Sequence, residues 1–206
     1  MNDLWIQFSQ ACEAVGTSPL EVLGFIFGVV CVALNAMENI WGWPTGLINV
    51  GIYIYIFFIA RLYADVVLNI FFFITGVYGW YHWLNGGNKK DDLPITTSPL
   101  KLWGMYLLVG ILGILIIGFF FDNYTNADLA YWDAYTTSFS LLAQVLMAQK
   151  KIENWLIWIA VDVIAIGIYW YKDLRLTALM FLIYLVLATL GYFNWKRKMG
   201  IQLANV

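Results

Sequence analysis

Apolar residues form seven long runs in this chain, separated by short polar breaks. Each run is close to the roughly 20 residues that a helix needs to cross about 30 Å of hydrocarbon. The alternation of apolar and polar residues that marks a transmembrane strand is absent from the sequence. The pattern therefore predicts an all-α integral membrane protein with seven transmembrane helices, near residues 19–37, 42–60, 64–84, 101–121, 129–148, 155–171 and 176–195.

Composition supports the membrane assignment and excludes several classes of function. Of the 206 residues 62% are hydrophobic and 12% are charged, about half the charge of a soluble domain. A net charge of -2 without a basic stripe argues against nucleic acid as a partner. The two cysteines, Cys12 and Cys31, lack the spacing of a metal or redox motif, so we expect no disulfide, metal or cofactor.

Two stretches of the chain repeat the same residues in the same order. Residues 38–43 (ENIWGW) are similar to residues 153–158 (ENWLIW), which lie 115 residues later. At the same spacing Gly76 and Trp80 match Gly191 and Trp195. A shared register over such a distance is typical of a duplicated unit. In this register Trp43 corresponds to Trp158.

The duplication divides the chain into two three-helix units joined by a linking helix. Four helices separate the two copies, an even number, so both units enter the membrane in the same direction and the repeat is parallel. We expect an interfacial N-terminal segment (1–17), a first unit (18–84), a linker with the fourth span (85–127), a second unit (128–197) and a tail (198–206). Parallel and inverted repeats place a substrate between their halves, which favours a transporter over a receptor.

The lysine and arginine residues predict the orientation. With the N-terminus outside, eight of the eleven basic residues lie on the cytoplasmic side, and Arg61, Lys172 and Arg175 lie outside. The positive-inside rule therefore favours an outer N-terminus and a cytoplasmic C-terminus in a multi-pass protein.

Asp162 is the outstanding polar residue within a predicted span. It lies eight residues beyond Asn154, about 12 Å along a helix, and shares one helix face with Asn154 and Trp158. A carboxylate near the bilayer midplane is costly and needs a partner, a cavity or a function. In the repeat its counterpart is Leu47, so the charge belongs to one half only.

Other polar and aromatic side chains in the spans complete a candidate cavity. They are Trp43, Asn49 and Tyr53 in the second span and Ser140 and Gln144 in the fifth. Aromatic faces and one carboxylate both favour positive charge, so the set suits a small, flat, hydrophilic cation. We expect Trp43 and Trp158, near the cytoplasmic ends of their spans, to help close an inner gate.

Several of these segments resemble the PnuC family of bacterial vitamin-precursor transporters. The resemblance rests on residues 43–50 (WPTGLINV), 71–73 (FFF), 78–81 (YGWY), Trp132-Asp133 and 153–158, and it extends over about residues 18–197. It implies a 3+1+3 fold similar to that of the SWEET sugar carriers and a homotrimer in the bacterial inner membrane. It also implies facilitated diffusion made directional by a cytoplasmic vitamin kinase, and a substrate shell that includes Asn49, Asn154 and Trp158.

The resemblance leaves the substrate open between two vitamins. Members of the family carry nicotinamide riboside, thiamine, riboflavin or deoxynucleosides. Nicotinamide riboside and thiamine both contain a ring cation and remain equal candidates, whereas riboflavin is neutral and larger and fits worse. Proton-coupled transport through Asp162 is an alternative mechanism. A membrane sensor or enzyme is a remote one, because His82 is the single histidine and a phosphate-binding loop is absent from the sequence.

Overall fold

The predicted helices are present in the computed structural model, which describes residue 7 and residues 18–87, 93–125 and 128–204. Within these residues the named helices are α2 (Pro19–Ala36), α3 (Gly42–Ile59), α4 (Tyr63–Asn85), α5 (Leu100–Tyr124), α6 (Ala130–Ala148), α7 (Glu153–Tyr171) and α8 (Arg175–Ala204). Their bounds follow the apolar runs closely, so the all-α prediction is confirmed. The expected interfacial segment, residues 1–17, lies outside the described residues apart from residue 7.

Local sequence explains where the first helix begins. The Ser18 hydroxyl accepts a hydrogen bond from the Glu21 amide at 3.2 Å, and the Glu21 carboxylate accepts one from the Ser18 amide at 2.7 Å. This reciprocal capping box satisfies two amides that would otherwise lack partners at the helix end. Pro19 occupies the first helical position, where its missing donor costs nothing.

Five of the helices are long and apolar enough to cross a membrane: α2, α3, α5, α7 and the main part of α8. The helices α4 and α6 are long enough but more polar. Asp65, Asn69 and Thr75 lie on α4, and Ser138 and Gln144 lie on α6. The two helices contact each other within the bundle. That α4 and α6 cross the membrane as well stays a prediction.

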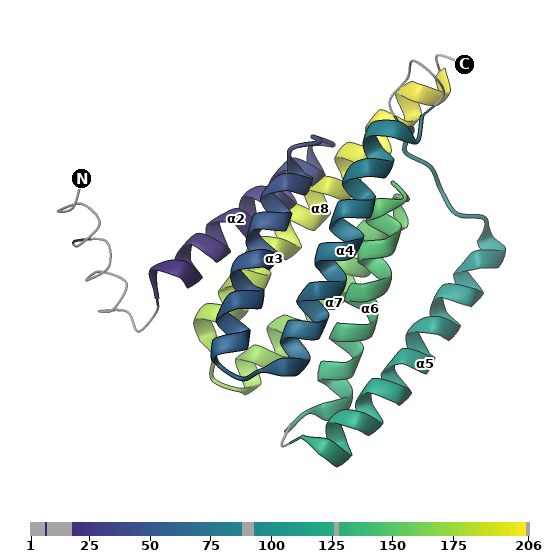
Figure 1. Cartoon of the computed structure of the whole chain (residues 1–206). Helices are drawn as coiled ribbons and strands as arrows, with labels where there is room; N and C mark the ends of the chain where they lie inside the picture. The colour runs from purple at the N-terminus through teal and green to yellow at the C-terminus, as the bar shows by residue number, and fades with distance from the viewer. Residues whose placement is uncertain (1–6, 8–17, 88–92, 126–127, 205–206) are drawn as a thin grey trace.

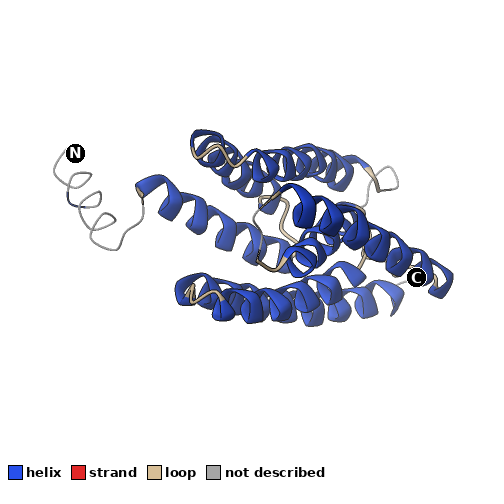
Figure 2. Ribbon diagram, turned by 90° about the horizontal axis from the view of Figure 1, so that it is seen from below, coloured by secondary structure: helices blue, strands red, loops and turns tan. Residues whose placement is uncertain are grey.

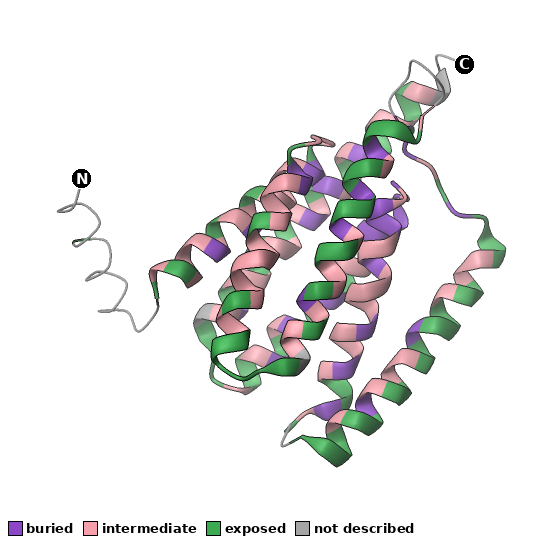
Figure 3. Ribbon diagram, viewed as in Figure 1, coloured by how far each residue is buried: buried purple, intermediate pink, exposed green. Residues whose placement is uncertain are grey.

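Six helices form a closed ring, and the seventh lies outside it. Successive helices alternate in direction (Figure 1). Contacts run in the order α2, α3, α4, α6, α7, α8 and back to α2, which closes a ring. Figure 2 shows the same bundle from below. Among the described helices the linking helix α5 contacts only α6, and it leaves much of its surface exposed (Figure 3). The ring therefore consists of two three-helix units, α2–α4 and α6–α8.

Backbone landmarks show that the two units repeat at a spacing of 112 residues. Among the described residues, four that are not glycine have positive φ: Glu38 (63°), Arg61 (60°), Lys150 (56°) and Asp173 (57°). Glu38 and Lys150 occupy the same place in the turns before α3 and α7. Arg61 and Asp173 occupy the same place in the turns before α4 and α8. Matching backbone hydrogen bonds flank both pairs, for example Glu38 to Asn35 and Lys150 to Met147, each at 2.9 Å.

The 115-residue register predicted from the sequence is therefore wrong by three residues. Glu38 lies in the turn before α3, whereas Glu153 is the first residue of α7, so the shared letters stand at different backbone positions. In the structure the equivalent of Trp43 is Trp155, and the equivalent of Trp158 is Gly46. Asp162 corresponds to Val50 rather than Leu47. The conclusion that the carboxylate belongs to one unit only still holds.

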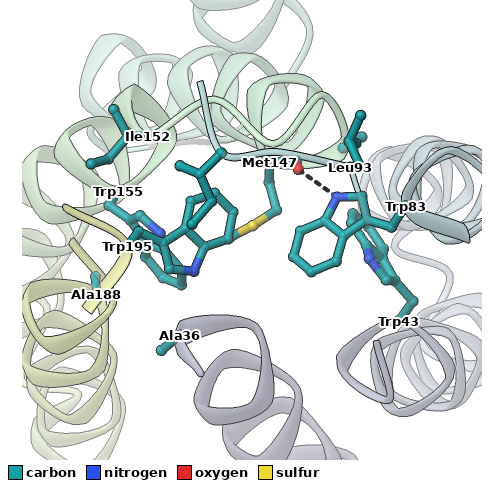
Figure 4. Close-up of a cluster of buried hydrophobic side chains, with 11 residues drawn as sticks. Ala36, Trp43, Trp83, Leu93, Met147, Ile152, Trp155, Ala188 and Trp195 are labelled. Atoms are coloured by element: carbon teal, nitrogen blue, oxygen red, sulfur yellow. Dashed lines mark hydrogen bonds between the residues drawn. The ribbon is translucent and has the colours of Figure 1, made fainter. Parts of the chain in front are cut away.

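A tryptophan quartet forms the main core, at one end of the ring. We call this end, at which α8 finishes, the C-terminal end of the bundle. Trp43 and Trp155 each meet a partner edge-to-face, Trp83 at 5.4 Å and Trp195 at 5.5 Å between ring centroids. Trp83 and Trp195 contact each other at 5.7 Å. Figure 4 shows the four indoles gathered around Met147, so aromatic packing joins the two units at this end.

The segment between α4 and α5 is more than the linker predicted from its composition. Residues 93–98, which we call the strap, lie against the turn between α6 and α7. Thr96 accepts a hydrogen bond from the Ile152 amide at 3.0 Å and donates one to the Lys150 carbonyl at 3.2 Å. Leu93 and Ile95 are buried in the tryptophan core. The strap therefore fixes the linker to the second unit and covers the C-terminal end.

Candidate substrate-binding site

A cavity of about 280 Å³ lies inside the ring and is lined by both units. Its walls come from α2, α3 and α4 of the first unit and from α6, α7 and α8 of the second. The lining residues are Gly28, Cys31, Val32, Asn35, Gly42, Trp43, Gly46, Leu47, Asn49, Val50, Asn69, Phe72, Gly76, Gln144, Met147, Trp155, Trp158, Asp162, Phe181, Tyr184 and Ala188. The position agrees with the expectation that a repeat transporter holds its substrate between its halves.

The lining follows the 112-residue repeat. For eight equivalent pairs of positions both members line the cavity: Val32/Gln144, Asn35/Met147, Trp43/Trp155, Gly46/Trp158, Val50/Asp162, Asn69/Phe181, Phe72/Tyr184 and Gly76/Ala188. The axis that relates the units therefore passes through the cavity.

Side-chain chemistry breaks this symmetry at most of the pairs. Five pairs join an apolar side chain to one with hydrogen-bonding groups, such as Val50 with Asp162 and Phe72 with Tyr184. Only Trp43 and Trp155 are identical. The backbone around the cavity is therefore symmetric, whereas the side chains that line it are not. Such a cavity can hold an asymmetric molecule in one orientation, because in these five pairs a polar side chain in one unit lies at the position of an apolar side chain in the other.

Asp162 supplies the only charged side chain among the residues that line this cavity. It is the tenth of the 19 residues of α7, near the middle of the helix, and its exposed fraction is 3%. Across residues 18–87, 93–125 and 128–204 no protein group donates a hydrogen bond to its carboxylate or pairs with it. A buried carboxylate without a protein partner is costly. A ligand with positive charge would offset that cost.

Five of the eight side chains predicted as substrate contacts line this one cavity. Trp43, Asn49, Gln144, Trp158 and Asp162 come from three helices and both units. Helical periodicity brings Trp158 and Asp162 to the same face of α7, as the spacing of four residues predicted. The structure places these five residues together, and their contact with a substrate remains a proposal.

The other three predicted contacts lie elsewhere. Tyr53 packs its ring on Phe57, at 5.5 Å between centroids. Ser140 is on α6 but does not line the cavity. Asn154 is fully buried at the start of α7, where its side-chain amide donates to the Lys151 carbonyl at 2.5 Å. Asn154 therefore stabilises the turn before α7, and the structure does not place it in the cavity.

Tyr184 is a polar cavity residue that the sequence pattern did not single out. It stands in a long apolar run of α8, where a tyrosine resembles an ordinary core residue. Its hydroxyl approaches α2 at Gly28, where a Cβ atom would lie 2.7 Å from the oxygen. The same Cβ would lie 2.9 Å from the Asn49 amide nitrogen, which donates to the Gly24 carbonyl at 2.6 Å. Glycine at position 28 thus lets two polar groups from different units approach α2.

The predicted gate residues lie beside the tryptophan core. Trp43 belongs to the quartet and is 3% exposed, and Trp158 is a partly buried neighbour of that core. The two are not equivalent by repeat, as described above, but both line the cavity at its C-terminal side. Their part in gating remains a proposal.

Comparison with known proteins identifies the family. The profile of the nicotinamide mononucleotide transporter family matches residues 18–197, which include both three-helix units and the linking helix. The chain belongs to this transporter family. The resemblance to PnuC proteins and the interpretation as a transporter rather than an enzyme are confirmed.

Curated relatives of this transporter carry different names. The nicotinamide riboside transporter PnuC of Escherichia coli K12 is 29% identical over 201 residues, covering 85% of this chain and 84% of that protein. PnuC of Neisseria mucosa is 24% identical over 190 residues, covering 86% and 72%. The riboflavin/roseoflavin transporter RibM of Streptomyces davaonensis is 22% identical over 179 residues, covering 85% and 83%.

A solved structure shares the fold. The crystal structure of the vitamin B3 transporter PnuC superposes with a TM-score of 0.71 at 23% identity, covering 95% of this chain and 89% of that one. The seven-helix transporter is therefore a multi-pass membrane protein with the PnuC fold.

Proposed function

We propose that this transporter mediates uptake of a small cationic heteroaromatic vitamin or its nucleoside, nicotinamide riboside or thiamine. The observation that carries the proposal is Asp162, a buried carboxylate that lines the cavity without a protein partner. A ring cation beside it would supply the missing positive charge, and Trp43, Trp155 and Trp158 offer aromatic faces to the same ligand. Asn49 and Gln144 add hydrogen-bonding amides, which suit hydroxyl or amine groups.

The size of the cavity and the relatives bear on the choice of vitamin. About 280 Å³ is at the lower edge of the roughly 300–1,000 Å³ found for small-molecule sites. This favours nicotinamide riboside or thiamine over the larger, neutral riboflavin, although RibM is named for riboflavin. The names of the PnuC relatives favour nicotinamide riboside. Thiamine remains the second candidate, since its aminopyrimidine also presents an amine to a carboxylate.

The proposed mechanism is alternating access by rocking of the two units around the cavity. Transport would be facilitated diffusion, and a cytoplasmic kinase would trap the vitamin by phosphorylation. We place the protein in the bacterial inner membrane with an outer N-terminus and a cytoplasmic C-terminus, as a homotrimer in which all seven helices span the bilayer. In this orientation the C-terminal end of the bundle faces the cytoplasm.

Uptake into liposomes tests the substrate directly. Purified transporter would be reconstituted, and entry of labelled nicotinamide riboside, thiamine and riboflavin would be measured in parallel, with protein-free liposomes as the control. One of the two cations should enter fastest and should also bind most tightly by calorimetry. Faster entry of riboflavin than of either cation would overturn the proposal.

Proton-coupled transport of the same class of vitamin is a second candidate, favoured by the same carboxylate. A buried carboxylate can be neutralised by a proton as well as by a cationic substrate, and membrane carriers use such groups as proton relays. Uptake with and without a proton gradient separates the two mechanisms. Accumulation above the outside concentration under a gradient supports coupling, and an unchanged plateau excludes it.

A further inference from the structure

The two units are joined by polar contacts that concentrate at the C-terminal end. The Trp83 indole donates a hydrogen bond to the Met147 carbonyl at 3.2 Å, and the Trp195 indole donates one to the Asn35 carbonyl at 3.0 Å. These bonds connect equivalent positions, because Trp83 and Asn35 in the first unit match Trp195 and Met147 in the second. Each unit therefore donates one indole hydrogen bond to a backbone carbonyl at the equivalent position of the other unit.

An ion pair between equivalent residues accompanies the crossed bonds. The Lys150 ammonium lies 2.7 Å from a Glu38 carboxylate oxygen, and the exposed fractions of the two side chains are 4% and 12%. Both residues occupy the positive-φ position of their turns, one before α3 and the other before α7. The repeat carries opposite charges at this position, and the ring brings them into contact.

The neighbours of Glu38 and Lys150 complete a closed polar network. The Lys150 ammonium also donates to the Leu93 carbonyl of the strap at 2.6 Å and lies 4.7 Å from the centroid of the Trp83 ring. The second carboxylate oxygen of Glu38 accepts from Lys198 at 2.8 Å. Lys198 also donates to the Met37 carbonyl at 3.0 Å. The network thus links the first unit, the strap and α8.

The opposite end of the ring is built differently. There Lys172 pairs with Asp133 at 3.1 Å and Arg175 with Asp173 at 3.0 Å, and both pairs lie within the second unit. In the part of the chain that the structure describes, no hydrogen bond or ion pair joins the two units at that end. The described polar contacts between units therefore lie at one end of the ring only.

We propose that the ion pair of Glu38 and Lys150, supported by Lys198, is a latch that closes the C-terminal end and opens once in each transport cycle. The inference rests on the proposed alternating access. A substrate held between the units can leave by this end only if the units separate here. An ion pair suits a contact that must open and close. Water that enters on opening hydrates both charges, and the buried ion pair is only slightly more stable than the two separated, hydrated charges.

Chemical labelling of the native Cys31 tests the latch without any substrate. Cys31 lines the cavity, so a membrane-impermeant thiol reagent added from the side of the C-terminal end reaches it only when that end opens. In a Cys12→Ser background, Glu38→Gln keeps the side-chain shape but removes the charge that holds Lys150 and Lys198. Labelling of Cys31 should become about 10-fold faster, in keeping with a shift between two conformations. An unchanged rate would overturn the proposal.

The matched control is the ion pair within the second unit. Lys172→Met removes a charge that also pairs across helices but does not join the two units. Its labelling rate should remain that of the background protein. Equal acceleration in both variants would show a general loosening of the bundle and would count against a latch.

Crosslinking tests whether the latch must open for transport. Cysteines introduced by Glu38→Cys and Lys150→Cys, in a Cys12→Ser, Cys31→Ser background, would be joined by a short bifunctional thiol reagent that a reductant can cleave. Crosslinked protein should bind the vitamin in calorimetry but transport it at least about 10-fold more slowly, with recovery after reduction. Crosslinking Asp133→Cys to Lys172→Cys should leave uptake within about two-fold.

The outcomes separate the latch from the proposed substrate. Full uptake by crosslinked Glu38→Cys, Lys150→Cys protein would overturn the latch and leave the proposed function intact. Failure of unmodified protein to transport any tested vitamin would overturn the proposed function, and the labelling of Cys31 would still decide whether Glu38 keeps this end closed. A poorly folded double-cysteine variant would likewise leave the Glu38→Gln labelling result to decide.

Discussion

Asp162 and Val50 face one cavity from equivalent positions of the two units, and only Asp162 carries a charge. The position has the same backbone surroundings in both halves, so the difference lies in the side chain alone. The fold therefore does not require a carboxylate at this depth. Its presence on one side gives the cavity a charged wall and an uncharged wall.

Asp162→Asn should weaken binding of the cationic substrate about 10-fold to 100-fold, which corresponds to one lost charge-assisted hydrogen bond. Calorimetry on purified protein measures the change. Asp122→Asn is the matched control, because Asp122 is an exposed carboxylate at the end of α5, outside the cavity. If Asp162→Asn leaves the affinities for nicotinamide riboside and thiamine intact, Asp162 does not contact the substrate.

Moving the charge across the axis tests the 112-residue register. Val50→Asp combined with Asp162→Val places a carboxylate on the opposite wall of the same cavity. The double variant should bind the cation more tightly than Asp162→Val alone, because a symmetric frame offers the charge a similar distance to the ligand. No recovery would count against the equivalence of positions 50 and 162 in the cavity.

Two glycines pack against the tryptophan quartet at equivalent positions. A Cβ atom at Gly79 would meet the Trp43 ring, and one at Gly191 would meet the Trp155 ring at 2.8 Å. Gly79→Ala and Gly191→Ala should each lower the free energy of unfolding by about 1–3 kcal/mol, the usual cost of overpacking. Thermal unfolding in detergent measures the loss.

Gly167→Ala is the control for these glycines, because among the described residues the added Cβ would meet nothing within 4 Å besides its chain neighbours and the backbone of its own helix. It should be neutral or slightly stabilising, since alanine favours helix over glycine by about 1 kcal/mol. A loss in Gly167→Ala equal to that in Gly79→Ala would show that the tryptophan contact is not the cause.

The hydrogen bonds that the Trp83 and Trp195 indoles donate across the two units should contribute equally to stability. Trp83→Phe and Trp195→Phe each keep an aromatic ring and remove one bond to a backbone carbonyl. Each should destabilise by about 1–3 kcal/mol, because a buried carbonyl loses its donor. Trp170→Phe, at a position that is 66% exposed, serves as the control. The double variant should depart from additivity, since Trp83 and Trp195 are in contact.

Glu153 fixes one end of the strap through a hydrogen bond, and this contact can be tested. Its carboxylate accepts a hydrogen bond from the Ser98 amide at 2.7 Å in a buried site. Glu153→Gln weakens this charge-assisted bond by about 1 kcal/mol or more, so exchange of the Ser98 amide hydrogen should accelerate. The Thr96 amide, bonded to the Lys150 carbonyl, is the internal control. Unchanged exchange at Ser98 would mean that Glu153 does not hold the strap.

The helices were predictable because each apolar run is long and its breaks are clear. The repeat could be recognised in the sequence, but its register could not. Glu38 and Glu153 are the same residue type but occupy different positions relative to the helices that follow them. Only the turn geometry at residues such as Lys150 reveals the true spacing. A repeated sequence motif shows that residue types recur, whereas the structural equivalence of two positions depends on where each helix begins.

The candidate site was predictable in part, for reasons that differ by residue. Asp162 and Trp158 followed from helical periodicity and from the cost of a charge in hydrocarbon. Tyr184 did not, because a tyrosine in an apolar run has no distinguishing pattern. The strap was also missed, since Leu93 and Ile95 lie in a hydrophilic stretch and become buried only through contact with distant helices.

The four turns with positive φ have a consequence for the charge at each end of the ring. A left-handed residue other than glycine raises the backbone free energy by roughly 1–2 kcal/mol, so glycine would relax each turn. The chain instead places a charged residue at these four described positions: Glu38 and Lys150 at the C-terminal end of the ring, and Arg61 and Asp173 at the other end. Among the described residues the first pair is joined by an ion pair and the second is not. Each end of the ring therefore carries complementary charges at equivalent positions of the two units, held in backbone conformations that only a specific local structure keeps.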